Sequence, residues 1–226
     1  MTVGILGAGA FGTSLSIALS TPNKKLILWT QNHGTVKSIQ EVRENRLRLP
    51  GYILPEQIIA TNDIAAIKDC SIVLIAVPMQ QLRSLVEMHG SILKGKILVA
   101  CCKGFEVSSG LGPTAILEIA SEKTAVLTGP SFASDLASGF PTALTIASKV
   151  EGLAKYIQKE LGTEILRLYW SNDPIGAELG GALKNVIAIG CGVTIGAGYG
   201  SNSRAALMTR GYSEIVNIAP YFGAKP

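Results

Sequence analysis

The chain has 226 residues, of which 47% are hydrophobic and 16% charged, so it can bury a sizeable core and is not a disordered chain. The formal net charge of +4 is small, the basic residues are scattered and only 6% of residues are aromatic, which argues against a nucleic-acid-binding protein. Four cysteines without a Cys-x-x-Cys pair and two histidines provide no clustered ligands, so we expect no metal site.

Eight short runs rich in β-branched and apolar residues alternate with longer segments of helical spacing. The runs cover residues 2–6, 26–29, 58–60, 71–77, 96–100, 125–128, 142–147 and 166–169. Several are continuously apolar, which is typical of parallel strands covered on both faces. The alternation predicts an α/β fold with a Rossmann-type doubly wound sheet.

Two regions depart from this alternation. Residues 44–57 carry Pro50, Gly51 and Pro55 and are predicted to form an irregular excursion. After Asp173 and Pro174, which are typical of a helix start, the strands end and a Gly- and Ala-rich helical pattern follows. We therefore expect a sheet domain over residues 1–175 and the beginning of an all-helical domain over residues 176–226.

The most apolar stretches are not expected to cross a membrane. The first twenty residues lack a basic start and contain four glycines, unlike a signal peptide. Residues 179–198 are also interrupted by glycines and by Lys184 and Asn185. Most of the cysteines lie in apolar runs, which favours reduced core residues and a cytoplasmic protein.

A glycine motif follows the first predicted strand. Gly7, Gly9 and Gly12 form G-x-G-x-x-G between this strand and a helix predicted over residues 13–19. The first glycine permits a tight turn, the second lets the backbone approach a pyrophosphate, and the third lets the helix pack closely on the strand. The context predicts a dinucleotide-binding domain, although a glycine-rich turn that binds nothing is the alternative.

The end of the second predicted strand does not choose between the two nicotinamide dinucleotides. An acidic residue there would bind the adenosine ribose hydroxyl of NAD, and an arginine would suit the 2′-phosphate of NADP. The chain has Thr30 and Gln31 at this place. We therefore expect NAD or NADP as the cofactor.

Other strand ends carry residues suited to an anionic substrate, because ligands of open α/β sheets bind beyond the carboxyl ends of strands. Pro78 follows the fourth predicted strand, Lys103 the fifth, and the turn Gly129-Pro130-Ser131 the sixth. The turn offers N–H donors and a hydroxyl, and the lysine a positive charge. A surface lysine and a plain turn are the alternative interpretation.

Lys184 and Asn185 lie inside a very apolar predicted helix with small residues on both sides. A buried lysine is costly unless it is paired or performs chemistry, and burial lowers its pKa from about 10.4 toward neutrality. Lys184 is therefore a candidate proton acceptor. The alternative is a lysine whose long side chain reaches the surface.

Taken together, these motifs resemble bacterial-type NAD(P)-dependent glycerol-3-phosphate dehydrogenases along nearly the whole chain. The matching stretches are GILGAGAFGTSLSIAL, LPGYILP, VPMQQLR, CCKGFE, TGPSFASDLASGFPTAL, GAELGGALKNVIAIGCG and NSRAALMTRG. The resemblance implies hydride exchange between NAD(P)H and dihydroxyacetone phosphate, which forms sn-glycerol 3-phosphate for phospholipid synthesis. The nicotinamide would carry the electrons, and Lys184 would be the proton acceptor.

The resemblance and the strand-end positions together define the expected site. The cofactor-binding set is Gly7, Gly9, Ala10, Phe11, Gly12, Gln31, Pro78, Lys103 and Ala133. The substrate-binding set is Lys103, Gly129, Ser131, Lys184 and Asn185. Lys184 is the one catalytic residue in this scheme.

The chain departs from the family pattern in a few places. Ala10 and Phe11 replace a frequent Ser-Trp pair, and Gln31 replaces a frequent basic residue, which bears on NADPH preference. Family members continue for roughly another hundred residues, the size of a small domain. This further part carries residues that bind the substrate phosphate, so we expect apolar helix faces to be uncovered in the present chain.

Two other functions stay open from the residues. One is another hydroxyacid dehydrogenase with a lysine on a helix after a Rossmann domain. The other is a non-catalytic dinucleotide-binding module, although Lys103, Ser131 and Lys184 argue against it. The apolar C-terminal helices also suggest a homodimer.

Overall fold

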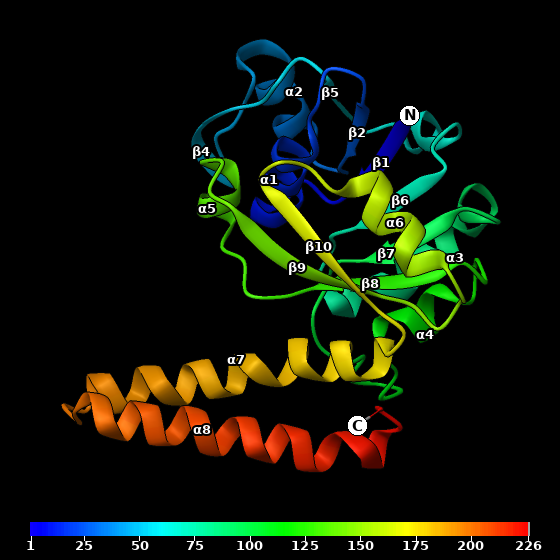
Figure 1. The fold of residues 1–226 in the computed structure, drawn as a ribbon. Coiled ribbons are helices and arrows are strands. Elements are labelled where there is room, and N and C mark those ends of the chain that lie inside the picture. Colours follow the sequence, from blue (N-terminus) through cyan, green and yellow to red (C-terminus); the bar gives the residue numbers. More distant parts are fainter. Residues whose placement is uncertain (226) are drawn as a thin grey trace.

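The computed structural model describes residues 1–225 and contains one large sheet with helices on both faces (Figure 1). The sheet has eight strands in the order β10-β9-β8-β7-β6-β1-β2-β5. They are β1 Thr2–Leu6, β2 Lys25–Trp29, β5 Ile58–Thr61, β6 Ile72–Ile75, β7 Ile97–Ala100, β8 Thr124–Thr128, β9 Thr142–Ala147 and β10 Leu166–Ser171. All eight predicted strands are confirmed, with ends that shift by at most two residues.

The order of the strands makes β1 the point where the chain reverses its direction across the sheet. From β1 the chain adds β2 and β5 on one side, and then β6, β7 and β8 on the other. These six strands are mutually parallel, which confirms the doubly wound Rossmann arrangement. Only β9 pairs antiparallel, with β8, and it pairs parallel with β10.

Each strand feeds two cores because successive side chains point to opposite faces. Leu26 and Leu28 of β2 pack with one core, which also contains Leu15 of the first helix. Ile27 and Trp29 of the same strand pack with the other. Helices α1 Ala10–Leu19, α2 His33–Val42, α5 Ala133–Ala137 and α6 Leu153–Leu161 cover the first face. Helices α3 Leu82–Leu93 and α4 Pro113–Leu117 cover the second, with the 3-10 turns η1 Ile64–Ile67 and η2 Met79–Gln81.

The expectation of an irregular segment over residues 44–57 is wrong in part. Two short antiparallel strands, β3 Glu44–Asn45 and β4 Leu49–Ile53, form a separate hairpin there. The fully buried Asn45 amide donates to the carbonyl oxygen of Ala8 at 2.9 Å and to the Thr13 hydroxyl at 2.8 Å. The hairpin is therefore held by tertiary contacts to the glycine turn, which Pro50 and Gly51 gave no local reason to expect.

The last two helices form an antiparallel pair that projects from one end of the sheet (Figure 1). They are α7 Pro174–Gly196 and α8 Ser201–Ile218, followed by the 3-10 turn η3 Ala219–Phe222. The predicted start of α7 is confirmed, since the Asp173 carboxylate accepts a hydrogen bond from the Gly176 N–H at 3.0 Å. The chain then returns to this point, where Lys225 N–H donates to the same carboxylate at 3.1 Å.

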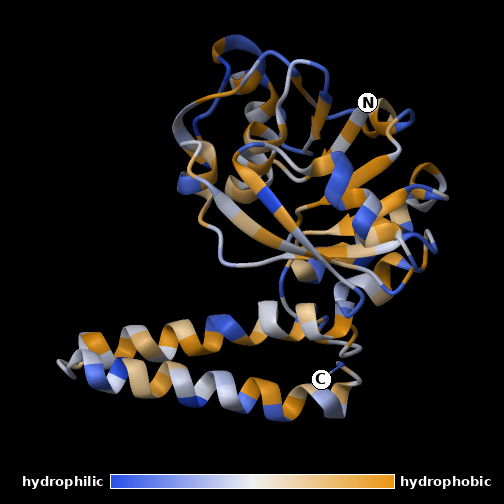
Figure 2. Cartoon of the chain, in the orientation of Figure 1, coloured by the Kyte–Doolittle hydropathy of each residue, from blue (hydrophilic) through white to orange (hydrophobic). Residues whose placement is uncertain are grey.

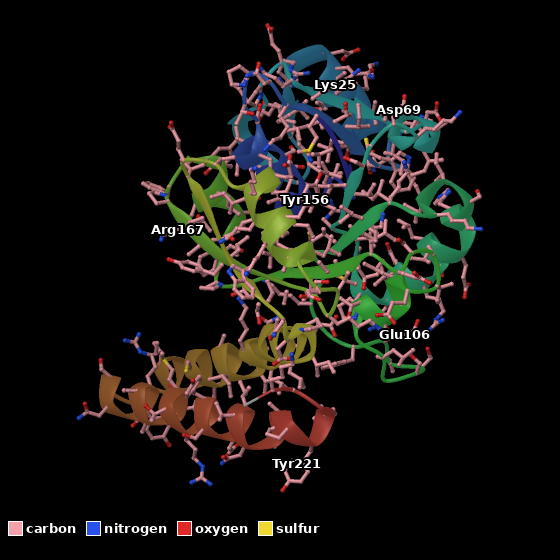
Figure 3. All side chains as sticks on the ribbon, turned by 45° about the vertical axis from the view of Figure 1, so that its right-hand side comes forward. Lys25, Asp69, Glu106, Tyr156, Arg167 and Tyr221 are labelled. Carbon is pink, nitrogen blue, oxygen red and sulfur yellow. The ribbon has the colours of Figure 1, made fainter. Side chains whose placement is uncertain are left out.

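Much of the apolar surface of this helix pair is uncovered within residues 1–225, as expected (Figure 2). Val186, Ile189 and Val193 of α7 are each more than three-fifths exposed, and Figure 3 shows Tyr221 pointing away from the chain. By length and composition, α7 is also apolar enough to cross a membrane, a property that core helices of soluble proteins share. The division into domains at residue 175 stays a prediction.

Candidate active site

The turn between β1 and α1 is shaped by its three glycines. Gly7 has φ +112°, and a Cβ there would lie 2.7 Å from the carbonyl oxygen of Ala76. A Cβ on Gly12 would lie 1.9 Å from the carbonyl oxygen of Gly7, so any side chain would push the helix away from the turn. A Cβ on Gly9, by contrast, would meet nothing within 4 Å. Gly9 therefore borders open space, where the first N–H groups of α1 can face an anion.

That space is a cavity of about 1000 Å³ beyond the ends of β1 and β6, where the sheet order reverses. Ligands of such sheets bind at this place, and the volume is at the upper end for small-molecule sites. Six predicted cofactor residues line it: Gly7, Gly9, Ala10, Phe11, Gln31 and Pro78. The cavity thus has the position, the volume and the glycine cradle that a dinucleotide needs.

Arg48 and His89 also line this cavity, and neither was predicted from the sequence. Arg48 follows the first strand of the hairpin, where its N–H donates to the Asn45 side-chain oxygen at 3.2 Å. His89 on α3 packs edge-on against Trp29, with ring centroids 5.7 Å apart. Prediction of the hairpin would have been needed to find Arg48, the one charged side chain on the described wall of the cavity.

Lys103 lies between this cavity and the helix pair. Its ammonium is 5.7 Å from the centre of the Phe11 ring, which is a cation–π distance. Its stem passes α7, since a Cβ on Gly181 would lie 4.0 Å from Lys103 Cγ. The predicted dual position of Lys103, near the cofactor cavity and the next site, therefore fits the geometry.

Lys184 points from α7 toward the end of β8 instead of reaching for solvent. Its ammonium donates to the carbonyl oxygen of Gly129 at 2.7 Å. Burial lowers the pKa of Lys184, and the positive charge of Lys103 lowers it further. A lysine in this setting releases its proton more readily than a surface lysine does.

A second cavity of about 280 Å³ lies beside Lys184. It is lined by Thr128 and Thr145 of the sheet, by Gly129 and Pro130 of the turn after β8, and by Gly176, Ala177, Gly180, Gly181 and Lys184 of α7. Two hydroxyl oxygens of this region, Thr128 Oγ1 and Ser131 Oγ, are buried without a hydrogen-bond partner in the described chain. Because buried polar groups are nearly always paired, these hydroxyls mark a place for a polar ligand or water. Thr128 was not predicted as a site residue, and its position at the end of an apolar strand was the only signal.

Five predicted residues do not line either cavity: Gly12, Lys103, Ser131, Ala133 and Asn185. Gly12 lies on the side of the turn away from the cavity, where it allows α1 to pack closely against Gly7. Ala133 begins α5, and Asn185 is exposed on α7 next to Lys184. The structure therefore brings together the glycine turn, Phe11, Lys103, Gly129 and Lys184, and leaves Ala133 and Asn185 at the margin.

A Rossmann sheet with an open glycine cradle, and a pair of lysines beside it, defines the chain as a dinucleotide-dependent oxidoreductase. Family models agree. The model of the NAD-dependent glycerol-3-phosphate dehydrogenase N-terminus matches residues 2–154, and that of the C-terminus matches residues 173–226. The chain belongs to the NAD-dependent glycerol-3-phosphate dehydrogenase family, and its cofactor is NAD or NADP.

Individual relatives support this assignment along the whole chain. Glycerol-3-phosphate dehydrogenase [NAD(P)+] of Ruegeria sp. (strain TM1040) is 50% identical over 228 residues, which cover 100% of this chain and 71% of the relative. The enzyme of the same name from Neisseria meningitidis serogroup A is 41% identical over 231 residues, covering 100% and 70%. The crystal structure of glycerol-3-phosphate dehydrogenase from Coxiella burnetii superposes with a TM-score of 0.91 at 32% identity, covering 99% and 70%.

These relationships decide between the functions left open by the residues. The chain is an NAD(P)-dependent oxidoreductase that interconverts dihydroxyacetone phosphate and sn-glycerol 3-phosphate. The relatives named above are all glycerol-3-phosphate dehydrogenases, which supports this activity over a non-catalytic binding module or another hydroxyacid dehydrogenase.

Proposed function

We propose that Lys184 is the proton acceptor of this dehydrogenase and that Lys103 holds the anionic substrate beside it. The observation that carries the proposal is the convergence of the two ammonium groups at the ends of β7 and β8, next to the cofactor cavity. When bound, the nicotinamide would supply the hydride acceptor or donor. The protein has to hold the substrate, orient it and move one proton.

The lowered pKa of Lys184 suits this proton transfer. In oxidation, its neutral amine takes the proton of the C2 hydroxyl of sn-glycerol 3-phosphate; in reduction, its ammonium returns that proton to the carbonyl oxygen. The ammonium group of Lys103 stabilises negative charge that develops on this oxygen. Such charge is felt strongly here because the lysines lie in a partly buried site.

The remaining substrate contacts come from the turn after β8. We assign to Ser131, whose hydroxyl is buried and unpaired, a hydrogen bond to the substrate, with Gly129 contributing its backbone. Thr128 offers a second hydroxyl from the strand end. Asn185, next to Lys184 on the exposed side of α7, completes the set on its outer margin.

The cofactor residues follow the wall of the large cavity. Gly7, Gly9 and Gly12 shape the turn for the pyrophosphate, while Ala10, Phe11, Pro78, Lys103 and Ala133 flank the rest of the dinucleotide. At the far end, Gln31 and Arg48 lie where an adenosine ribose would bind. Because the guanidinium of Arg48 can bind a 2′-phosphate, we assign to Arg48 the preference between NADPH and NADH.

An assay tests the central role. Dihydroxyacetone phosphate reduction, followed by loss of NADH or NADPH absorbance, should fall roughly 100- to 10 000-fold in Lys184→Ala, the contribution typical of a general acid–base residue. Lys159→Ala, which changes an exposed lysine on α6, is the control and should keep full turnover. Wild-type turnover in Lys184→Ala, with the fold intact by circular dichroism, would refute the proposed role.

The setting of the enzyme is also part of the proposal. Its product is the glycerol phosphate from which glycerophospholipids are built, and its four free, buried cysteines suit the reducing cytoplasm. Loss of the gene should be rescued by external glycerol 3-phosphate. The exposed apolar residues of α7 and α8 suit a homodimer with no membrane partner, which sedimentation of the protein tests directly.

A further inference from the structure

Glu178 is a buried carboxylate on α7 whose side chain contacts the start of α4. Its residue is 7% exposed, and it forms no ion pair within residues 1–225. Its Oε1 accepts a hydrogen bond from the Thr114 backbone N–H at 2.8 Å. Burying a carboxylate without a cationic partner costs free energy, so the hydrogen bond to Thr114 is needed to hold Glu178 in this place.

The contact caps α4 from another helix. This helix begins after Gly112, which has no side chain to accept a hydrogen bond from the free N–H groups of its first turn. Glu178 supplies the acceptor instead. Glycine at position 112 also leaves room for the Glu178 carboxylate, because a Cβ on Gly112 would lie 2.2 Å from Glu178 Oε2.

The capped segment is the one that carries Lys103. It runs from the end of β7 to the start of α4, and its other side is held by α3 and the turn before it. There, Gln80 donates to the carbonyl oxygen of Phe105 at 2.8 Å, and Arg83 pairs with Glu106 at 2.7 Å (Figure 3 labels Glu106). Glu178 is the contact that fastens this segment to α7.

Glu178 and Lys184 lie on the same helix, about 9 Å apart along its axis. We propose that Glu178 is a positioning residue, which sets the spacing between Lys103 and Lys184 by locking α7 onto the start of α4. The inference rests on the proposed role of Lys184. It predicts that loss of the Glu178–Thr114 hydrogen bond shifts α7 as a rigid helix and thereby changes the distance between Lys103 and Lys184.

The spacing between Lys103 and Lys184 can be measured through the titration of Lys184. Lys184 faces the positive charge of Lys103, which helps to lower its pKa. Around Glu178 lie the Cys102 thiol, whose pKa burial raises to about 12, and Glu118, which pairs with Lys149 at 2.7 Å. Arg204 and Arg210 on the packed helix α8 are exposed. If the lysines separate, the pKa of Lys184 must rise.

The test measures the reactivity of Lys184 without requiring turnover. Trace acetic anhydride labels neutral amines, and peptide mass spectrometry gives the acetylation rate of Lys184 against pH. In Glu178→Ala and Gly112→Ala we expect a rate about threefold lower at neutral pH, as for a lysine that has lost part of the influence of a neighbouring charge. Glu178→Gln should match the wild type, because its amide oxygen still accepts from Thr114.

One control variant and one kinetic measurement make the comparison specific. Gly90→Ala places a methyl group on α3 where nothing lies within 4 Å, and should leave the profile unchanged. In parallel, kcat for dihydroxyacetone phosphate should fall in Glu178→Ala and Gly112→Ala while KM for the cofactor stays constant. A merely structural contact would not shift the titration of Lys184 in a folded variant.

The experiments distinguish a failure of the positioning role of Glu178 from a failure of the proposed proton acceptor, Lys184. An unchanged Lys184 profile in Gly112→Ala, or equal damage by Glu178→Gln and Glu178→Ala, would overturn the positioning role. If Glu178→Ala fails to fold, the Lys184 profiles of Gly112→Ala and Glu178→Gln still test the positioning role. Shifted labelling together with full turnover in Lys184→Ala would refute the proposed proton acceptor and leave the positioning of the two lysines intact.

Discussion

At the scale of single residues, the three glycines of the turn after β1 have different physical duties. Gly7 and Gly12 are required by the protein itself, since a Cβ at either would strike backbone oxygen. Gly9 is not, because the space in front of it is open. The same motif therefore combines two residues needed for folding with one reserved for the ligand.

This difference predicts opposite results for two alanine substitutions. Gly12→Ala should lower the free energy of unfolding by about 1–3 kcal/mol, because the turn must move away from α1. Gly9→Ala should leave unfolding nearly unchanged but weaken the binding of NADH, since the methyl group fills the space of the pyrophosphate. Urea denaturation and a fluorescence titration measure the two effects. Wild-type cofactor affinity in Gly9→Ala would contradict the assignment of the cavity.

At the scale of elements, the segment between β7 and α4 is held by side chains from α3, α7 and the turn η2. Arg83 of α3 forms a two-pronged pair with Glu106, and Ser109 donates to the same carboxylate. These hydrogen bonds, that of Arg83 foremost, lower the pKa of Glu106 to about 2 from an ordinary value of 4.5. The ionised carboxylate is thus part of what orders the segment that carries Lys103.

The lowered pKa predicts a loss of stability in acid. A carboxyl whose pKa is lower in the folded than in the unfolded state stabilises the fold above its unfolded pKa. This contribution is present above pH 4.5 and disappears as the pH falls toward about 2. Glu106→Gln should therefore show a smaller decline of the free energy of unfolding over this range. Glu87→Gln, which alters a more exposed partner of Arg83, should decline as the wild type does.

At the scale of the whole molecule, α7 and α8 form a pair that depends on close helix approach. A Cβ on Gly211 would lie 2.3 Å from Cδ1 of Ile187, so glycine lets α8 pack against α7. Gly192 of α7, in contrast, faces open space. The pair can therefore be loosened at one position without altering the sheet or the cofactor cavity.

Gly211→Ala should destabilise the helix pair by about 1–3 kcal/mol through overpacking, while NADH affinity remains unchanged. Gly192→Ala is the matched control and should be neutral or slightly stabilising, because alanine favours the helix. Hydrogen exchange resolved by peptide would report the helices and the sheet separately. Faster exchange across the sheet in Gly211→Ala would show that the two parts do not respond independently.

The eight strands, the glycine turn, the start of α7 and the family could all be predicted from the amino-acid sequence, because each depends on local signals. Continuous apolar runs define buried strands, and Asp173-Pro174 is a local helix start. Even the candidate lysines were visible, since charged residues in apolar surroundings or at strand ends stand out. These features need only a few neighbouring residues to be recognised.

The remaining parts of the site became apparent from the three-dimensional packing of the chain. Arg48 reaches the cavity through a hairpin that Asn45 holds from across the fold, and Thr128 is notable only because its buried hydroxyl has no partner. Glu178 meets Thr114 across 64 positions of the chain. Contacts between residues so distant in sequence depend on how helices and strands pack, and no local pattern of residues carries that information.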